Sequence, residues 1–155
     1  MKKLLSLTLV VVIGLFVTGC FNRESTTIIE HDHTGIDAIA GTMTITIEAR
    51  GDRVLTWEEV THYDLEDYLA FYGYENTDEI REWFEGTGPD LMTFNGMDFE
   101  LVDITDTQII TRMFFDYSVI SDADRATILG AEYDFVSLSQ TIELHREEGA
   151  RIIEE

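Results

Sequence analysis

The sequence predicts an α+β domain in which an antiparallel sheet of about four strands, arranged as two hairpins, packs against helices. Two stretches in which apolar and polar residues alternate, each followed by a turn and a second extended stretch, predict the hairpins. Between and after them, apolar residues recur at the three- and four-residue spacing of an amphipathic helix. Because the strands come in pairs and do not alternate with helices, the sheet is expected to be antiparallel.

The first hairpin is expected between residues 42 and 63. Its first strand is predicted by apolar residues that alternate with polar ones: Met43, Ile45, Ile47 and Ala49. The turn Arg50-Gly51-Asp52-Arg53 follows, and then a stretch rich in threonine, valine and aromatic residues. Arg50-Gly51-Asp52 also spells an integrin-binding tripeptide, but a tight turn alone accounts for glycine and aspartate at these positions. We therefore interpret the tripeptide as a turn and not as an adhesion site.

Two helices are expected in the middle of the chain. The first ends at Gly73, after apolar residues at helical spacing: Leu65, Tyr68, Leu69 and Tyr72. The second begins at Asn76, which forms a capping box with Glu79, and ends in the glycines and proline of residues 86–89. Its apolar face consists of Ile80, Trp83 and Phe84.

Aromatic residues gather in and around these two helices: Tyr63, Tyr68, Phe71, Tyr72, Tyr74 and Trp83. Helical spacing favours core packing for Tyr68, Tyr72 and Trp83. Tyr74, beside Gly73, is expected to be exposed, so it is the candidate binding residue of this region. A sugar or a peptide could stack on its ring.

The second hairpin is expected between residues 97 and 117. Its first strand is predicted by Met97, Phe99 and Leu101, which alternate with polar, mostly acidic residues. Residues 105–107 form the turn, and an apolar stretch over 109–117 forms the partner strand.

The last third of the chain is expected to be mainly helical. A short helix is predicted over 122–129, and a longer one begins near Ser137, with Gln140 completing its cap, and ends at Gly149. The apolar pair at residues 152–153 is compatible with a terminal strand.

The chain begins with a basic segment, Met1-Lys2-Lys3, followed by an apolar stretch from Leu4 to Val17. As a helix of about 14 residues this stretch would be ~21 Å long. A bilayer core of about 30 Å takes about 20 apolar residues. The segment is therefore expected to be a secretory signal and not a transmembrane helix.

Val17-Thr18-Gly19-Cys20 resembles the lipobox of bacterial lipoproteins. The resemblance implies cleavage between Gly19 and Cys20 and a diacylglycerol thioether on Cys20, which an N-acyl lipid such as palmitate can join. Two acyl chains anchor a protein stably. Since Cys20 is the only cysteine, the mature domain would have neither a disulfide nor a thiolate ligand. The expected organisation is a signal peptide over 1–19, the lipidated cysteine and a flexible tether over 20–40, and a single α+β domain over 41–155. Within the tether, Ile28-Ile29 could instead start an edge strand.

Two segments of this domain, TITIEARGDRVLTWEEVTHYD and FVSLSQTIELHREEGARII, resemble the YehR-like family of small bacterial lipoproteins. That family combines a lipobox and a strand with a GDxVL-type turn and a closing SLxxTIExxxxxG helix. Ala150, after the glycine, and arginine in place of lysine depart from the family pattern. The resemblance implies an α+β envelope lipoprotein whose biochemical activity is not established.

The composition is strongly acidic, with 31 acidic and 10 basic residues and a formal net charge of −21. Lys2 and Lys3 would leave with the signal peptide. The mature chain would then have eight arginines and 31 acidic residues, which gives a net charge of −23. Such a field repels nucleic acid and anionic membrane surfaces, which leaves the lipid as the expected membrane attachment. Two interpretations stay open: carboxylates that recruit a cationic ligand, or a surface adapted to salty or alkaline surroundings.

His31-Asp32-His33 is the candidate metal site, with His62 or His145 completing the ligand set. Because the segment falls in the expected tether, and a flexible tether organises a metal poorly, we expect polar linker residues and no metal or other cofactor. With 31 acids, the sequence nominates no pair of catalytic carboxylates. The common hydrolase and nucleotide-binding motifs are also missing, so an enzyme is not expected.

The sequence thus predicts a lipoprotein held in a cell membrane, with its domain on the extracytoplasmic side and a non-enzymatic binding or structural role. The alternative is an accessory lipoprotein that captures a ligand or cation for a membrane transporter. The ligand, the protein partner, the choice of inner or outer membrane and the oligomeric state all stay open at this point.

Overall fold

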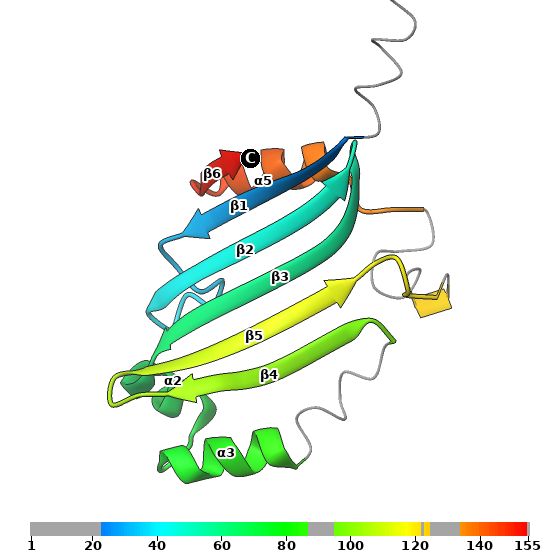
Figure 1. Ribbon diagram of the computed structural model, residues 1–155. Coiled ribbons are helices and arrows are strands. Elements are labelled where there is room, and N and C mark those ends of the chain that lie inside the picture. The colour runs from blue at the N-terminus through cyan, green and yellow to red at the C-terminus, as the bar shows by residue number, and fades with distance from the viewer. Residues whose placement is uncertain (1–22, 87–94, 122, 125–133, 155) are drawn as a thin grey trace, which may run out of the picture.

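The structure is a computed structural model that describes residues 23–86, 95–121, 123–124 and 134–154. One antiparallel sheet has the strand order β4-β5-β3-β2-β1-β6 (Figure 1). Its strands are β1 (Glu24–His31), β2 (Gly41–Arg50), β3 (Arg53–Asp64), β4 (Met97–Ile104), β5 (Gln108–Asp116) and β6 (Arg151–Glu154). The helices are α2 (Leu65–Tyr72), α3 (Thr77–Glu85) and α5 (Leu138–Glu147). The α+β class and the hairpins β2–β3 and β4–β5 are confirmed, but the sheet has six strands and not about four.

The two additional strands come from the ends of the described chain. β1 pairs with β2 along its whole length and with β6 on its other side. The expected tether over 20–40 is therefore corrected, because its residues 24–31 form an internal strand of the sheet. Three alternate residues of β1, Thr27, Ile29 and His31, are buried. Only one of these three residues is aliphatic. The sequence of β1 therefore lacks the alternation of apolar and polar residues that predicts β2 and β4.

The predicted helix boundaries follow from capping groups that the structure contains. α2 ends at Gly73, which has a left-handed φ of 73° and donates its N–H to Leu69 O. The side chain of Asn76 accepts hydrogen bonds from the backbone N–H groups of Asp78 and Glu79 at the start of α3. Ser137 caps α5 as expected. The short helix predicted over 122–129 lies mostly outside the described residues.

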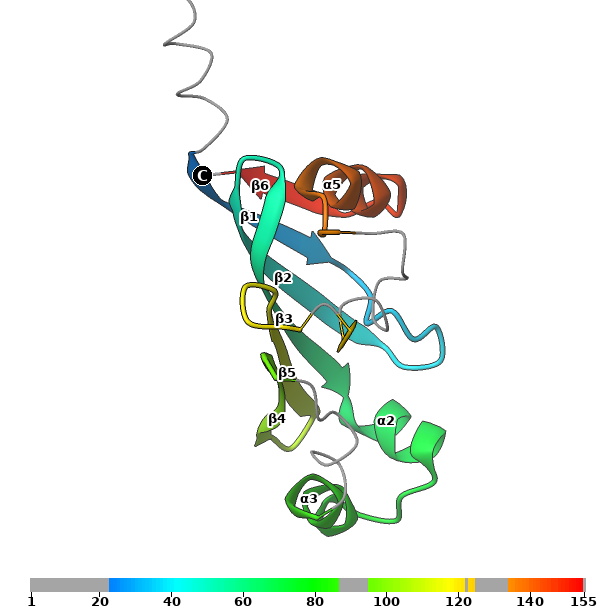
Figure 2. The same cartoon turned by 90° about the vertical axis from the view of Figure 1, so that its right-hand side faces the viewer.

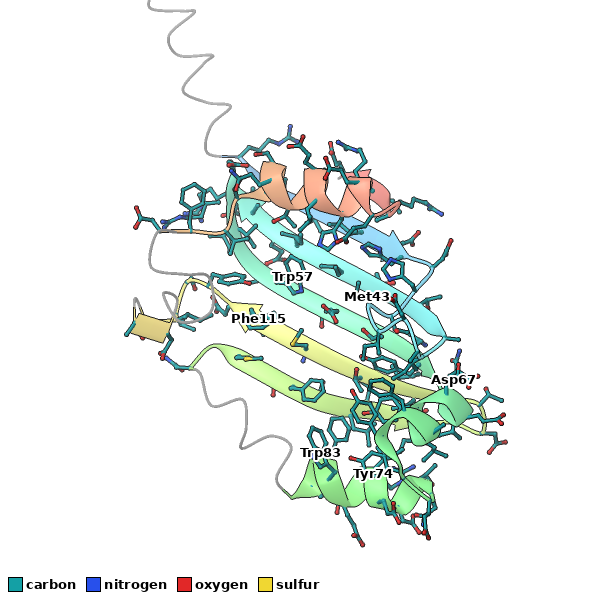
Figure 3. All side chains as sticks on the ribbon, turned by 180° about the vertical axis from the view of Figure 1, so that it is seen from behind. Met43, Trp57, Asp67, Tyr74, Trp83 and Phe115 are labelled. Atoms are coloured by element: carbon teal, nitrogen blue, oxygen red, sulfur yellow. The ribbon has the colours of Figure 1, made fainter. Side chains whose placement is uncertain are left out.

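The described helices lie on one face of the sheet (Figure 2). α5 lies at the β1–β6 end and α2 and α3 at the β4–β5 end, with the middle of β3 and β5 between them (Figure 3). The core has two corresponding parts. Near α5 it contains Ile29, Met43, Ile45, Ile47 and Val54. Near α2 and α3 it contains Ile39, Tyr68, Ile80, Phe84 and Ile109.

The β2–β3 turn holds the first turn of α5. The carboxylate of Asp52 accepts hydrogen bonds from Ser139 N at 2.8 Å and from Ser137 Oγ at 2.7 Å. Leu138 N donates to the backbone oxygen of Asp52 at 2.8 Å, and Arg53 forms an isolated antiparallel bridge with Ser137. A carboxylate is also favourable at this place because the N-terminus of a helix carries a partial positive charge. Asp52 of the Arg50-Gly51-Asp52 turn therefore has a structural role at the base of α5.

We expect Asp52→Asn to lower the free energy of unfolding by about 1 kcal/mol at neutral pH, the usual value of a lost helix-capping interaction. Burial would raise the pKa of Asp52, but hydrogen bonds from Ser139 and Ser137 outweigh it and hold the pKa below its ordinary value. The contribution of Asp52 is therefore complete above the ordinary pKa of aspartate and is lost as the pH falls through the folded-state pKa. Thermal unfolding from pH 7 to pH 2 measures it.

A matched control is Asp106→Asn in the exposed β4–β5 turn, which should leave the melting temperature nearly unchanged. An Asp52→Asn effect that stays constant down to the lowest pH would contradict the assigned role of the ionised carboxylate.

Candidate metal centre

Two neighbouring histidines and a third that is distant in the sequence meet at one end of the helix-bearing face. His31 ends β1, His33 follows it by two residues, and His145 lies in the last turn of α5. His31 Nε2 is 3.0 Å from His145 Nδ1, and His31 Nδ1 is 3.1 Å from His33 Nε2. His31 is only 3% exposed. The expectation that His31 belongs to a flexible tether is therefore wrong, because strand pairing fixes it.

Of the two histidines proposed to complete the site, the structure brings in only His145. In β3 the buried Thr61 precedes His62, and successive side chains of a strand point to opposite faces. His62 therefore belongs to the face that the described helices leave open. Glu148, which the sequence analysis did not single out, joins the cluster instead, with Oε2 3.2 Å from His145 Nδ1.

His31, His145 and Glu148 each offer one ligand atom, and these atoms all lie within 4.8 Å of one another. Zinc binds histidine nitrogen at about 2.0–2.1 Å in tetrahedral geometry. Two ligand atoms of such a site are therefore ~3.3 Å apart. The 3.0 Å and 3.2 Å separations, both measured from His145 Nδ1, are close to this value, and the exposed Glu148 would have to move toward His31, from which its ligand atom lies within 4.8 Å. Small side-chain adjustments would thus suffice to hold a tetrahedral ion on three protein ligands.

The contacts of the cluster are consistent with the following placement of its protons. Gly35 N donates to His33 Nδ1, so Nε2 carries the proton of a neutral His33 and donates to His31 Nδ1. His31 then donates from Nε2 to His145 Nδ1. In this tautomer one proton lies among three electron-pair donors: the facing nitrogens of His31 and His145 and the carboxylate of Glu148. A metal ion could replace that proton and satisfy all three groups.

Metal binding requires a change of tautomer. If His31 Nε2 binds an ion, its proton moves to Nδ1, and His33 must then accept through Nε2 and carry its own proton on Nδ1. The cost is the exposed hydrogen bond from Gly35 N to His33, worth about 1 kcal/mol. In the metal-bound form His33 would orient the ligand ring, as the outer partners of zinc-binding histidines commonly do.

The surroundings favour the neutral, metal-binding form of His31. Burial lowers the pKa of His31, and the neighbouring His145 and His33 lower it further, against smaller opposing effects of Glu148 and Asp32. A neutral imidazole has the free electron pair that a metal requires. His31 therefore has little of the proton competition that weakens metal binding by ordinary histidines near neutral pH.

Residues of β3 lie beside the histidine cluster. The ring of Trp57 lies with its centroid 5.8 Å from that of His145. Glu59, two residues further along the same face, is half-buried and accepts a hydrogen bond from Thr61 Oγ1 at 3.3 Å. Burial raises the pKa of Glu59, although hydrogen bonds with Thr61 and Trp57 and the neighbouring His145 act against the increase. A carboxylate in surroundings that disfavour its charge is typical of functional sites.

Sequence reasoning missed Glu59 and Glu148 because the chain contains 31 acids. One signal could have identified Glu59. Trp57, Glu59, Thr61 and Tyr63 occupy alternate positions of β3, so a strand with an aromatic inner face should place Glu59 there too. Glu148 had no such signal, because its position depends on how α5 docks.

The remaining candidate residues have mixed outcomes. Tyr68 is buried as expected, but Tyr72 is 47% exposed, so its predicted core position is wrong. Tyr74 is half-buried and lines a cavity with other aromatic residues, so it is less exposed than expected. Gly19 and Cys20 lie outside the described residues. In the part of the chain that the structure describes, no helix is long and apolar enough to cross a membrane.

Comparison of the sequence with models of known protein families and with curated proteins finds no match. Two structures solved by NMR have a similar fold. Escherichia coli YehR superposes with a TM-score of 0.61 at 16% identity, over 85% of this chain and 92% of YehR. A protein from Streptococcus pneumoniae TIGR4 superposes with a TM-score of 0.56 at 19% identity, over 85% of this chain and 86% of that one. The chain thus has a YehR-like fold.

We expect Glu59→Gln to raise the melting temperature at pH 8 and to have less effect at pH 4. The raised pKa means that the folded protein binds the Glu59 proton more tightly than the unfolded chain does. Stability is therefore lost as the pH rises from the ordinary glutamate pKa through the folded-state pKa. Glutamine does not ionise, so the variant keeps its stability over this pH range. Differential scanning calorimetry at both pH values measures the difference.

Glu48→Gln, at an exposed position of β2, is the control and should change the melting temperature little at either pH. A Glu59→Gln variant less stable than the parent at pH 8 would show that the carboxylate stabilises the fold.

Proposed function

We propose that the protein is a lipid-anchored protein of the cell envelope that reversibly binds a divalent transition-metal ion, zinc above all. The observation that carries the proposal is the convergence of His31, His145 and Glu148, whose ligand atoms all lie within 4.8 Å of one another. Nitrogen ligands favour zinc and its neighbours in the first transition series over calcium and magnesium, which prefer oxygen.

The site suits capture better than catalysis. Three protein ligands leave a fourth position open to water or to a donor atom of a receiving protein. His31 is nearly inaccessible, and the side chain of His145 is 12% exposed. Little room therefore exists beside the ion for an organic substrate. These features favour the cation-capturing form of an envelope lipoprotein over a metal-dependent hydrolase.

The charge of the molecule supports binding of a cation. A net charge of −21 raises the local concentration of cations around the protein and speeds their association. The histidine cluster also lies at the last turn of α5, where the helix carries a partial negative charge that stabilises a nearby cation. The acidic surface would thus collect ions, and the histidines would select among them.

The proposed anchor would place the site away from the lipid. β1 begins at Glu24, four residues after Cys20, so at most ~14 Å of chain would separate the strand from the lipidated residue. His31 lies seven residues further along the strand, at ~23 Å from Glu24. A lipid on Cys20 would hold the sheet close to the membrane, while the metal site at the far end of β1 would face the surroundings.

We expect one zinc ion to bind per molecule in isothermal titration calorimetry. The titrated chain carries Cys20→Ser, because the sole thiol is a competing zinc ligand. His145→Ala should weaken binding about 100-fold or more, and His33→Ala, which removes an orienting partner, about 10–100-fold. The control His62→Ala lies on the opposite face and should bind like the parent. Equal affinities of the His145→Ala and His62→Ala variants, or no binding by the parent, would contradict the proposal.

The lipid anchor has an independent test in the native bacterium. Metabolic labelling with a clickable fatty acid should mark the wild-type chain and leave Cys20→Ser unmarked. The serine variant should also keep its signal peptide or leave the membrane fraction, because two acyl chains provide the stable anchor. A Cys20→Ser chain that matures and stays in the membrane fraction would show that attachment does not depend on this residue.

A further inference from the structure

Six aromatic side chains line a cavity of about 250 Å³ at the β4–β5 end of the helix-bearing face. They are Tyr63, Tyr68, Tyr72, Tyr74, Trp83 and Phe99, contributed by β3, α2, the α2–α3 connection, α3 and β4. Tyr74 and Trp83 lie near each other at this end in Figure 3, away from Trp57, and the lining includes none of His31, His145 and Glu148. The cavity is therefore separate from the candidate metal centre.

The tyrosine rings form a continuous curved wall. Neighbouring ring centroids are 5.2 Å apart for Tyr63 and Tyr68, 4.6 Å for Tyr68 and Tyr72, and 6.1 Å for Tyr72 and Tyr74. The corresponding interplanar angles are 58°, 46° and 31°, so each ring is turned relative to the previous one. Trp83 and Phe99, with centroids 6.4 Å apart, form a second group of rings.

The backbone holds this wall in place. Gly73 takes the left-handed conformation that ends α2, and its N–H donates to Leu69 O. Tyr74 N also donates to Leu69 O, at 3.0 Å. These two hydrogen bonds close the end of the helix and fix the direction in which the chain carries Tyr74. Tyr68 is 7% exposed and belongs to the core. The cavity is therefore built on the rigid part of the fold.

The residues that line the cavity favour a cationic ligand. The seventh lining residue is Thr111, so the lining contains no charged side chain. An anion would find no positive partner there and would be repelled by the net charge of −21. The faces of aromatic rings carry negative electrostatic potential and attract cations, most strongly where the cation is poorly hydrated. Quaternary ammonium groups have this property.

We propose that the aromatic cavity binds a small organic cation with a quaternary ammonium headgroup. The volume of about 250 Å³ is below the roughly 300–1,000 Å³ of sites for drug-sized ligands, which fits a small molecule. A sugar fits less well, because sugar sites add carboxylate, amide or guanidinium groups to the stacking rings. This lining offers only hydroxyl groups and the indole N–H of Trp83 beside its ring faces. The inference does not depend on metal binding or on the lipid anchor.

The two tryptophans of the chain allow a direct test, because Trp57 and Trp83 lie well apart on the face in Figure 3. In the full chain carrying Trp57→Phe, Trp83 is the sole tryptophan and reports on the cavity. Titration with choline chloride at constant ionic strength should give a saturable change in its fluorescence. The neutral isostere 3,3-dimethylbutan-1-ol should give none at the same concentrations.

Variants locate the binding site. Tyr74→Leu removes one ring and should weaken choline binding about tenfold, whereas Tyr74→Phe keeps the ring and should bind like the parent. His145→Ala should also bind like the parent. The comparison of choline with its isostere needs no cavity variant. It therefore tests whether binding requires the positive charge even if Tyr74→Leu does not fold. Equal binding of the neutral isostere, saturable binding of N-acetylglucosamine without choline binding, or no saturable signal would each overturn the proposal.

Discussion

The candidate metal centre depends on how α5 is attached to the sheet, because no residue of this helix is buried. α5 is held at its two ends. Asp52 accepts hydrogen bonds from Ser137 and Ser139 at its start, and β6, which follows its end closely, pairs with β1. A helix fixed at both ends has little freedom to slide or rotate. That constraint is what brings His145, in the last turn, against His31.

The same face of the sheet carries two groups whose charged forms are disfavoured by burial, and for Glu59 this lowers the stability of the fold near neutral pH. His31 is buried, which makes protonation unfavourable, and Glu59 is half-buried, which makes ionisation unfavourable. Apolar side chains at both positions would pack against Ile29 and Ile45 without these costs. Instead, a histidine and a glutamate lie on the face where Trp57 and His145 meet. Polar groups retained against a cost in stability are a physical sign of a binding site.

The sequence predicted those parts of the fold that local patterns determine. The hairpins β2–β3 and β4–β5 follow from alternation, and α3 follows from the capping side chain of Asn76. β1 has no such pattern, since a threonine and a histidine take the buried positions beside Ile29, and β6 has only four residues. The candidate metal centre was named from the sequence through His31 and His33, and these were interpreted as linker residues that bind no metal. His31 and His33 are neighbours in sequence, whereas the choice of His145 over His62 depends on sheet faces and on helix docking.

The resemblance to YehR-like proteins and the candidate metal centre concern different residues of the same segments. Asp52 belongs to the GDxVL-type turn, and Ser137 begins the SLxxTIExxxxxG helix, so these two motifs form the contact that positions α5. His145 and Glu148 occupy unspecified positions of the second motif. A chain can therefore share this turn, this helix and this fold without sharing the metal ligands. For this reason the similarity in fold gives no support to metal binding, which rests on the side chains of this chain alone.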